Sequence, residues 1–361
     1  MSIVQPHIER LHAYSSGIQP PKGNGAIKLN LNENPYPPST HVLKALHSVD
    51  EETLQRYPDA LCDELRTALA KLYGVKKEQT LCGNGSSEII SLLFSVFIRA
   101  QDRIAIPYPS FSLYHSVAAI HQVECVNVPT QDDFSVNVEW LLESRSNVIV
   151  LVNPNAPTGR LLPVSEVERL VKNFPGLVVV DEAYIDFADP HASVIPLIER
   201  YANLLVVRTF SKVYSLCGAR IGYCFSNKAF IAAMEKGKNL YNVNVISQRL
   251  ALAALQDQEH MKRTAIAVGH TRDAFSANLQ SLGFDVIPSQ TNFVLCTPPA
   301  HIGDNGARQL YEKLMERNIY VRYFEDSRLS DKLRISIGTD EEMTILYNEL
   351  HCLLYKLHLI F

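Results

Sequence analysis

Short apolar runs recur through the middle of the sequence, at residues 104–106, 123–128, 148–152, 177–180, 204–207 and 221–225. Strands of a sheet that is covered on both faces have this largely continuous apolar character, whereas half-exposed strands alternate apolar and polar residues. Segments with helical spacing separate the runs, for example around residues 111–121 and 163–174. The alternation predicts an α/β fold in which a mainly parallel sheet lies between helices.

The length of the chain suggests two domains, or one large domain with an appendage. The chain has 361 residues, of which 47% are hydrophobic, and this is enough to bury a core larger than one typical domain needs. After residue 240, helical segments such as 248–282 are mixed with short strand segments, which is typical of an α+β domain. We therefore expect an N-terminal arm at 1–28, a large domain at 29–240 and a small domain at 241–361. The first segment of the large domain is also compatible with the small one.

Charge and cysteine content argue against several classes of function. The formal net charge of -4 gives no reason to expect nucleic acid or an anionic membrane as a partner. No apolar run is long enough for a signal-peptide core or a membrane span, so we expect a cytoplasmic protein. The seven cysteines are odd in number and lack C-x-x-C spacing. They predict reduced thiols, with neither a disulfide framework nor a metal site.

One lysine lies among groups that bind phosphate. Lys212 follows an apolar run, with Thr209 and Ser211 beside it and Arg220 eight residues further on. Most lysines are simply solvated, and Lys212 alone could be read in that way. Hydroxyls and a guanidinium, however, are the groups that hold a phosphate, and lysine forms Schiff bases with pyridoxal phosphate. We infer that Lys212 holds pyridoxal phosphate as an aldimine, while Thr209, Ser211 and Arg220 bind its phosphate.

Two further segments supply the other contacts that this cofactor needs. Asp181 and Tyr184 follow the apolar run at 177–180, at the carboxyl end of a predicted strand, where open α/β sheets bind ligands. An aspartate there keeps the pyridine nitrogen protonated, and a tyrosine binds the phenolic oxygen. Ser86 and Ser87 open a predicted helix after two glycines, and helix N-termini attract anions. A simple capping role remains the alternative for each segment.

These motifs resemble those of fold-type I pyridoxal-phosphate-dependent aminotransferases, and among them the histidinol-phosphate aminotransferase family. The resemblance extends over nearly the whole chain. The matching segments occur in the same order, at residues 29–35, 56–59, 83–88, 109–114, 153–159, 181–184, 209–223 and 333–338.

The resemblance implies several roles that the residues alone do not indicate. Phe111 would lie flat on the pyridine ring. Tyr57 would reach the cofactor phosphate of a partner subunit, in a homodimer with shared active sites. Arg334 would bind the anionic group of the substrate, with Arg322 and Tyr14 as further substrate contacts. Ordinary packing is the alternative for Phe111 and Tyr14, and a structural ion pair is the alternative for Arg334.

One position departs from the wider superfamily, which usually has asparagine where this chain has Ala156. That asparagine donates to the phenolic oxygen of the cofactor. Either Asn155 supplies the contact from the neighbouring position, or Tyr184 makes it alone.

The family implies amino transfer between histidinol phosphate and 2-oxoglutarate. An aminotransferase for aromatic or other amino acids and a threonine-phosphate decarboxylase are alternatives on the same fold. A ligand sensor without chemistry is a further alternative. The joint presence of Lys212, Asp181, Tyr184 and Arg220 favours an enzyme.

Overall fold

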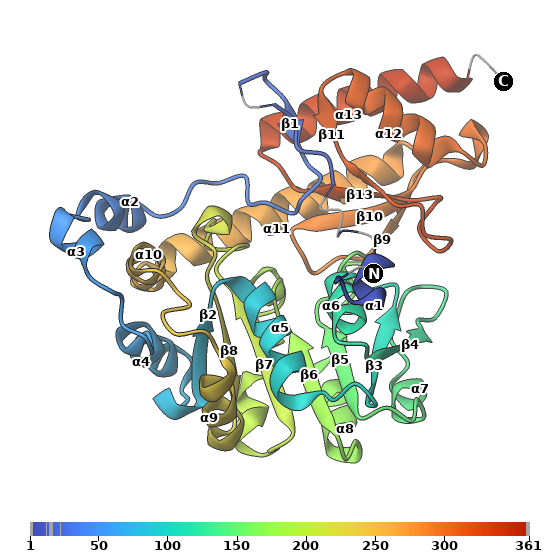
Figure 1. Cartoon of the computed structure of the whole chain (residues 1–361). Helices are drawn as coiled ribbons and strands as arrows, with labels where there is room; N and C mark the ends of the chain where they lie inside the picture. Colours follow the sequence, from blue (N-terminus) through green and yellow to red (C-terminus); the bar gives the residue numbers. More distant parts are fainter. Residues whose placement is uncertain (1–2, 12, 14–16, 22, 359–361) are drawn as a thin grey trace.

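The computed structural model describes residues 3–11, 13, 17–21 and 23–358 of the chain, which form two lobes (Figure 1). The large lobe is built on the largest sheet and its helices. The small lobe contains two smaller sheets and the helices of the C-terminal third. A cavity lies between the two lobes.

Seven described strands form the sheet of the large lobe, in the order β2-β8-β7-β6-β5-β3-β4. Neighbouring strands are parallel, except that β8 runs antiparallel to both β2 and β7. The predicted mainly parallel sheet is therefore confirmed, although β2 was not predicted as a strand. The strands are β2 (Thr80–Gly83), β3 (Arg103–Tyr108), β4 (Glu124–Pro129), β5 (Val148–Val152), β6 (Leu177–Asp181), β7 (Leu204–Thr209) and β8 (Gly222–Ser226).

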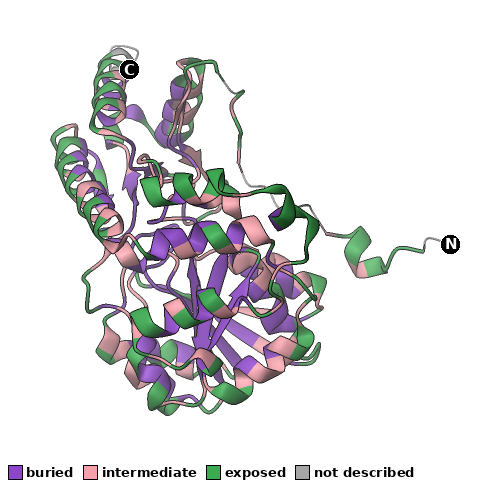
Figure 2. Ribbon diagram, turned by 90° about the vertical axis from the view of Figure 1, so that its left-hand side faces the viewer, coloured by how far each residue is buried: buried purple, intermediate pink, exposed green. Residues whose placement is uncertain are grey.

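Both faces of this sheet are buried under helices (Figure 2). Alternate residues of β5 show the two faces, because Val150 belongs to one apolar cluster and Leu151 to the other. The first cluster includes apolar side chains of α5 (Gly85–Phe97), α6 (Leu113–Ile120) and α9 (Lys228–Gly237). The second includes those of α4 (Asp63–Tyr73), α7 (Val138–Leu142) and α8 (Val164–Asn173).

A buried ion pair fixes the ends of β6 and β7 to each other. The Arg208 guanidinium donates to Glu182 Oε2 over 3.0 Å and also to Asp186, and the side chains of Arg208 and Glu182 are almost fully buried. Removing one partner of such a pair leaves an uncompensated charge, which typically costs about 3 to 5 kcal/mol. Arg208 and Glu182 are chain neighbours of Thr209 and Asp181, so the pair also restrains these two residues of the cavity wall.

The small lobe combines C-terminal segments with the start of the chain. Its antiparallel sheet has the order β12-β13-β10-β9, and β1 (Ile27–Lys28) pairs in parallel with β11 (Ile319–Tyr320) in a separate sheet. The segment after β1 therefore lies on this lobe and enters the cavity from it. The remaining elements are β9 (Asp285–Ile287), β10 (Phe293–Thr297), β12 (Arg322–Tyr323), β13 (Leu333–Ser336), α11 (Gln258–Ser281), α12 (Gly306–Glu316) and α13 (Asp340–His358).

The predicted helical region at 248–282 consists of two helices, α10 (Val245–Leu255) and α11. The break occurs at Asp257, whose side chain accepts a hydrogen bond from His260 N and so caps α11. Helix α10 packs beside α2 (Thr40–His47), which Ser39 caps as predicted. In the part of the chain that the structure describes, no helix is both long enough and apolar enough to cross a membrane.

Candidate active site

A cavity of about 760 Å³ lies at the carboxyl ends of the parallel strands, below the small lobe. Its wall includes the last residues of β5, β6 and β7, namely Val152, Asp181 and Thr209. The cavity brings together most of the residues that the sequence predicted for the site. These are Ser86, Ser87, Phe111, Asp181, Tyr184, Thr209, Ser211, Lys212, Arg220, Arg322 and Arg334.

The Lys212 amine points from the loop after β7 toward the segment that follows β1. Its Nζ donates to the carbonyl oxygens of Asn32, over 3.1 Å, and of Leu31, over 3.4 Å. The same amine lies 5.5 Å from the centre of the Tyr184 ring. Asn34 holds the lysine's own backbone by donating to the carbonyl of Lys212 over 3.1 Å. The amine is thus held inside the cavity by backbone carbonyl groups. Among the described residues, none of its hydrogen bonds goes to a carboxylate.

One end of the cavity is a cradle of hydroxyls and backbone amides. Ser86 and Ser87 belong to the first turn of α5, and Arg220 Nη1 lies 3.4 Å from Ser211 Oγ. Two glycines allow these groups to approach closely. A Cβ on Gly85, which has φ +78°, would lie 2.5 Å from Arg220 Nη2, and one on Gly222 would lie 2.4 Å from Ser86 N. A helix N-terminus, hydroxyls and a guanidinium together suit a phosphate group.

Asp181 forms the deepest polar part of the wall. Only 2% of the residue is exposed, and its carboxylate accepts from Tyr114 Oη over 2.9 Å and from Ala183 N over 3.1 Å. Burial raises the pKa of Asp181 to about 6, while the hydrogen bonds from Tyr114 and Ala183 and the charge of Lys212 act in the opposite direction. A cationic ligand beside Asp181 would stabilise the ionised carboxylate, because it would offset the cost of burying the charge.

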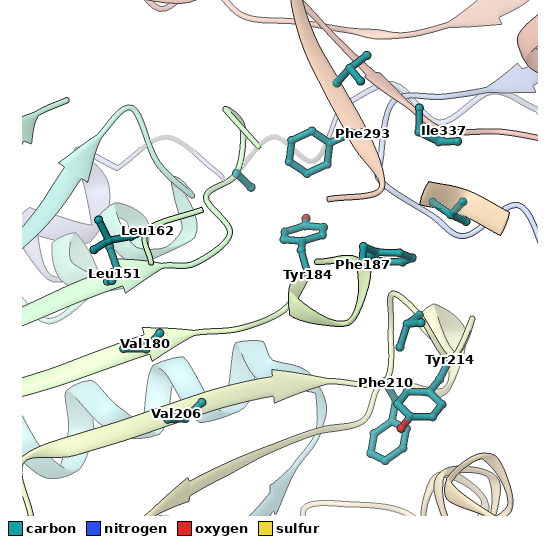
Figure 3. Close-up of a cluster of buried hydrophobic side chains, with 14 of the residues drawn as sticks. Leu151, Leu162, Val180, Tyr184, Phe187, Val206, Phe210, Tyr214, Phe293 and Ile337 are labelled. Atoms are coloured by element: carbon teal, nitrogen blue, oxygen red, sulfur yellow. The ribbon is translucent and has the colours of Figure 1, made fainter. Parts of the chain in front are cut away.

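Tyr184 lies where the two lobes meet. Its ring makes an edge contact with Phe293 of β10, with ring centres 5.2 Å apart (Figure 3). Its hydroxyl accepts a hydrogen bond from Asn32 Nδ2 over 3.0 Å. The phenol is therefore fixed by both lobes and keeps its own hydrogen for another acceptor.

Two arginines of the small lobe face the cavity side by side. Arg322 and Arg334 are opposite each other on the antiparallel strands β12 and β13. Both guanidinium groups lie over the ring of Phe324, 5.3 and 5.6 Å from its centre, and Arg334 Nη2 donates to Asn30 O over 2.7 Å. Like charges directly opposite in a sheet repel each other. An anion bound between the two side chains would remove this cost.

Comparison with known proteins assigns the chain to a family. The model of the family "Aminotransferase class I and II" matches residues 24–350. The chain belongs to this family. The histidinol-phosphate aminotransferase 1 proteins of Bordetella parapertussis and Trichormus variabilis are 41% and 37% identical to this aminotransferase. Each match covers 96% of this chain, and 97% and 98% of the respective relatives.

Solved structures agree with this assignment. Histidinol-phosphate aminotransferase from Sinorhizobium meliloti, in complex with pyridoxal 5'-phosphate, has a TM-score of 0.90 at 27% identity, over 99% of both chains. L-threonine-O-3-phosphate decarboxylase from Porphyromonas gingivalis has a TM-score of 0.79 at 24% identity, over 91% of this chain and 99% of that one, which shows a common fold. The predicted fold class and enzyme class, a pyridoxal-phosphate-dependent aminotransferase, are confirmed.

The residues present in this aminotransferase fit the cofactor. The cradle between Gly85 and Arg220 has the donors and the glycines that a phosphate requires. The buried Asp181 is suited to a protonated pyridine nitrogen, and Lys212 lies in the same cavity. Phe111 also lines this cavity, as its predicted stacking role requires.

Asn155 does not reach the cavity wall, which Ala156 and Pro157 form instead. The Asn155 amide nitrogen donates to Pro109 O and Thr158 Oγ1, each over 2.9 Å, and its oxygen accepts from Ser110 Oγ over 2.8 Å. The Asn155 side chain is thus bonded to residues 109 and 110 and to Thr158. This argues against the alternative in which Asn155 contacts the phenolic oxygen.

Of the two other predicted residues, one lies away from the cavity and one is outside the residues that the structure describes. Tyr57 is 81% exposed and stacks on Tyr241, with ring centres 4.6 Å apart. It does not line the cavity of its own chain. Tyr14 lies outside the described residues.

Sequence reasoning missed the central role of Asn32. This residue has φ 55°, donates to Tyr184 Oη, and accepts from Lys212 Nζ through its backbone oxygen. Its backbone oxygen also accepts from Asn292 Nδ2 over 3.0 Å. The segment at 29–35 was noted only as a family motif. Asparagine tolerates left-handed backbone, but no local pattern indicates partners so distant in sequence.

The raised pKa of Asp181 predicts a pH dependence of stability in the cofactor-free protein. The pKa is about 6 in the folded state against an ordinary value of 3.8, so the folded state binds this proton more tightly. The free energy of unfolding should therefore fall as pH rises from about 4 to about 6, by roughly 3 kcal/mol for this group. Asp181→Asn should lack this contribution. Urea unfolding of both proteins across this range tests it, and a pH-independent difference between them would contradict it.

Proposed function

We propose that this aminotransferase transfers an amino group reversibly from histidinol phosphate to 2-oxoglutarate, which becomes glutamate. The pair formed by Arg322 and Arg334 carries the proposal, because it presents two guanidinium groups to the cavity that contains Lys212. Histidinol phosphate has a phosphate and no α-carboxylate, whereas glutamate has two carboxylates. A guanidinium fork suits either anion, so one site can accept both substrates in turn. The names of the curated relatives support this substrate.

The residues of the large lobe divide the remaining tasks. Pyridoxal phosphate, when bound, supplies an electron sink for the charge that develops on the substrate carbon. Lys212 would anchor it covalently, and its amine, once free, would move the proton at the substrate carbon. The phosphate would be held by Ser86, Ser87, Thr209, Ser211 and Arg220. Asp181 would bind the pyridine nitrogen, Tyr184 the phenolic oxygen, and Phe111 would lie on the ring.

The first prediction from this proposed function concerns Lys212. Lys212→Ala should abolish turnover, because it removes both the covalent anchor and the group that moves the proton. Arg220→Ala should mainly weaken retention of pyridoxal phosphate, by about ten- to a hundredfold, because one charge-assisted contact is lost. Steady-state rates and cofactor titration measure the two effects, with Lys172→Ala on the distant helix α8 as the control. Amino transfer at the unmutated rate by Lys212→Ala would disprove the assignment.

The second prediction separates the two arginines. Arg334→Ala should impair amino transfer from both histidinol phosphate and glutamate. Arg322→Ala should impair histidinol phosphate more, each by roughly ten- to a hundredfold. Single-turnover reactions with histidinol phosphate, glutamate, phenylalanine and threonine phosphate measure this directly.

The same reactions distinguish the alternatives. If the unmutated enzyme prefers phenylalanine, or if Arg322→Ala changes none of the four substrates, a broad aminotransferase becomes the better assignment. Release of carbon dioxide from threonine phosphate would instead identify a decarboxylase. A protein that binds the cofactor and converts none of the amines would be a sensor.

We also propose that the enzyme is a homodimer in which Tyr57 contacts the cofactor phosphate of the partner subunit. Tyr57 stacks on Tyr241, and Leu43, Leu54 and Leu240 are also exposed apolar side chains. Exposed apolar side chains that gather in one patch are typical of protein interfaces. Leu43 belongs to α2 (Thr40–His47) and Leu54 to α3 (Glu51–Gln55), and both helices lie on one side of the molecule (Figure 1).

Subunit complementation tests the shared site. In a heterodimer of Tyr57→Phe and Lys212→Ala subunits, one site receives an unmutated Tyr57 and an unmutated Lys212, while the other receives both defects. The mixture should therefore be more active than the average of its two parents. Sedimentation checks the assembly state. A fully active monomer, or a mixture no better than its parents, would rule out the shared site.

A further inference from the structure

The Arg328 guanidinium ties the turn that follows β12 to the large lobe. Arg328 Nη1 donates to Tyr108 O over 3.2 Å, to Thr130 O over 2.9 Å and to Thr130 Oγ1 over 3.0 Å. Its Nη2 donates to Gln131 O over 2.9 Å. These acceptors lie at the carboxyl ends of β3 and β4, where the strand ladder ends. Tyr108 O also accepts from Thr130 N, and Gln131 O from Phe134 N, so Arg328 is a further donor to carbonyl groups at this end of the sheet.

Asp326 makes a second bond between the same two elements. One carboxylate oxygen accepts from the Tyr108 hydroxyl, and the other accepts from Arg328 N over 2.9 Å. The hydrogen bond to Asp326 raises the pKa of Tyr108 to about 12, so the phenol stays protonated as the donor. Asp326 therefore shapes the turn and binds the large lobe at the same time.

An apolar contact lies beneath these polar bonds. Phe134 of the large lobe packs against Leu329 of the turn and Leu295 of β10. The Arg328 guanidinium lies 5.1 Å from the centre of the Phe134 ring. Phe134 has φ 62°, a left-handed backbone conformation that is uncommon and strained for a bulky residue. The backbone adopts this conformation where the ring joins the two lobes.

The turn is also joined to the pair of arginines that faces the cavity. Phe324 lies between β12 and the turn, and both Arg322 and Arg334 lie over its ring. Phe324, Asp326 and Leu329 themselves line the cavity. A displacement of the turn would therefore move the surface on which the two guanidinium groups rest.

We propose that residues 324–329 form a latch between the lobes, and that Arg328 is a positioning residue for the Arg322–Arg334 pair. Arg328 fixes the distance between these guanidinium groups and the cofactor end of the cavity. It acts on the binding of anionic substrates without touching them. The proposal rests on the proposed function only in its assignment of the anion to Arg322 and Arg334.

Arg328→Met tests the latch in the cofactor-loaded enzyme, because methionine keeps an apolar stem and removes every donor. Amide hydrogen exchange of peptides that cover 322–332 should increase, while exchange of 204–226 stays unchanged. KM for glutamate and for histidinol phosphate should each rise by about tenfold, with a smaller change in kcat. The affinity for pyridoxal phosphate should be unaffected, because its cradle belongs to the large lobe.

Matched variants keep the test decisive. Arg200→Met, which removes an exposed arginine that pairs with Glu168 on α8, should leave all these measurements unchanged. Arg328→Lys should retain only part of the latch, with values between those of the unmutated enzyme and Arg328→Met, because an ammonium cannot bind all of the carbonyl groups at once. Thr130→Val removes one acceptor from the other lobe. It should show a smaller change of the same kind, even if Arg328→Met fails to fold.

Two results would overturn the latch. The first is a folded Arg328→Met protein in which exchange at 322–332 and KM for glutamate are both unchanged. The second is a loss of cofactor affinity as large as the rise in KM, which would indicate general damage to the site. An unmutated enzyme that uses glutamate but rejects histidinol phosphate would refute the proposed substrate. In that case the exchange and glutamate measurements would still decide the latch.

Discussion

The parallel pairing of β5, β6 and β7 determines where the chemistry of this enzyme can lie. Because these strands run in the same direction, their last residues, Val152, Asp181 and Thr209, meet at one edge of the sheet. The loops that carry Tyr184 and Lys212 begin from this edge. The buried Arg208–Glu182 pair then holds two of the strand ends together, directly beside the cavity wall. The position of the cavity is thus a property of the sheet before any loop is considered.

The site holds several charged groups in arrangements that are unfavourable without ligands. Burial raises the pKa of the Asp181 carboxyl group, and Arg322 lies directly opposite Arg334. Each arrangement becomes favourable when a charge of opposite sign arrives, a cation beside Asp181 and an anion beside the arginines. Local conflicts of this kind are expected where a protein is built to bind something. Part of the free energy of ligand binding therefore comes from reducing the repulsion between the two arginines and from compensating the buried charge of Asp181.

Residues that follow a strand directly could be predicted from the sequence, and residues that act across the lobes could not. Lys212 and Asp181 were found because an apolar run, a turn and a polar side chain are adjacent in the chain. Asn32 contacts Tyr184, 152 residues away, and Arg328 contacts Thr130, 198 residues away. No periodicity or spacing encodes such a pair. The helical region at 248–282 was found as well, but its break depends on one capping side chain at Asp257.

The pairing of β1 with β11 has a consequence for how the enzyme is made. Leu31 and Asn32 line the cavity, yet the strand that leads to them hydrogen-bonds to Ile319 and Tyr320. The large sheet ends at Ser226, so a nascent chain can complete it on the ribosome while β11 is still untranslated. The acceptors of the Lys212 amine come to their places only after the C-terminal third has emerged. The large sheet can therefore fold before the active site is complete.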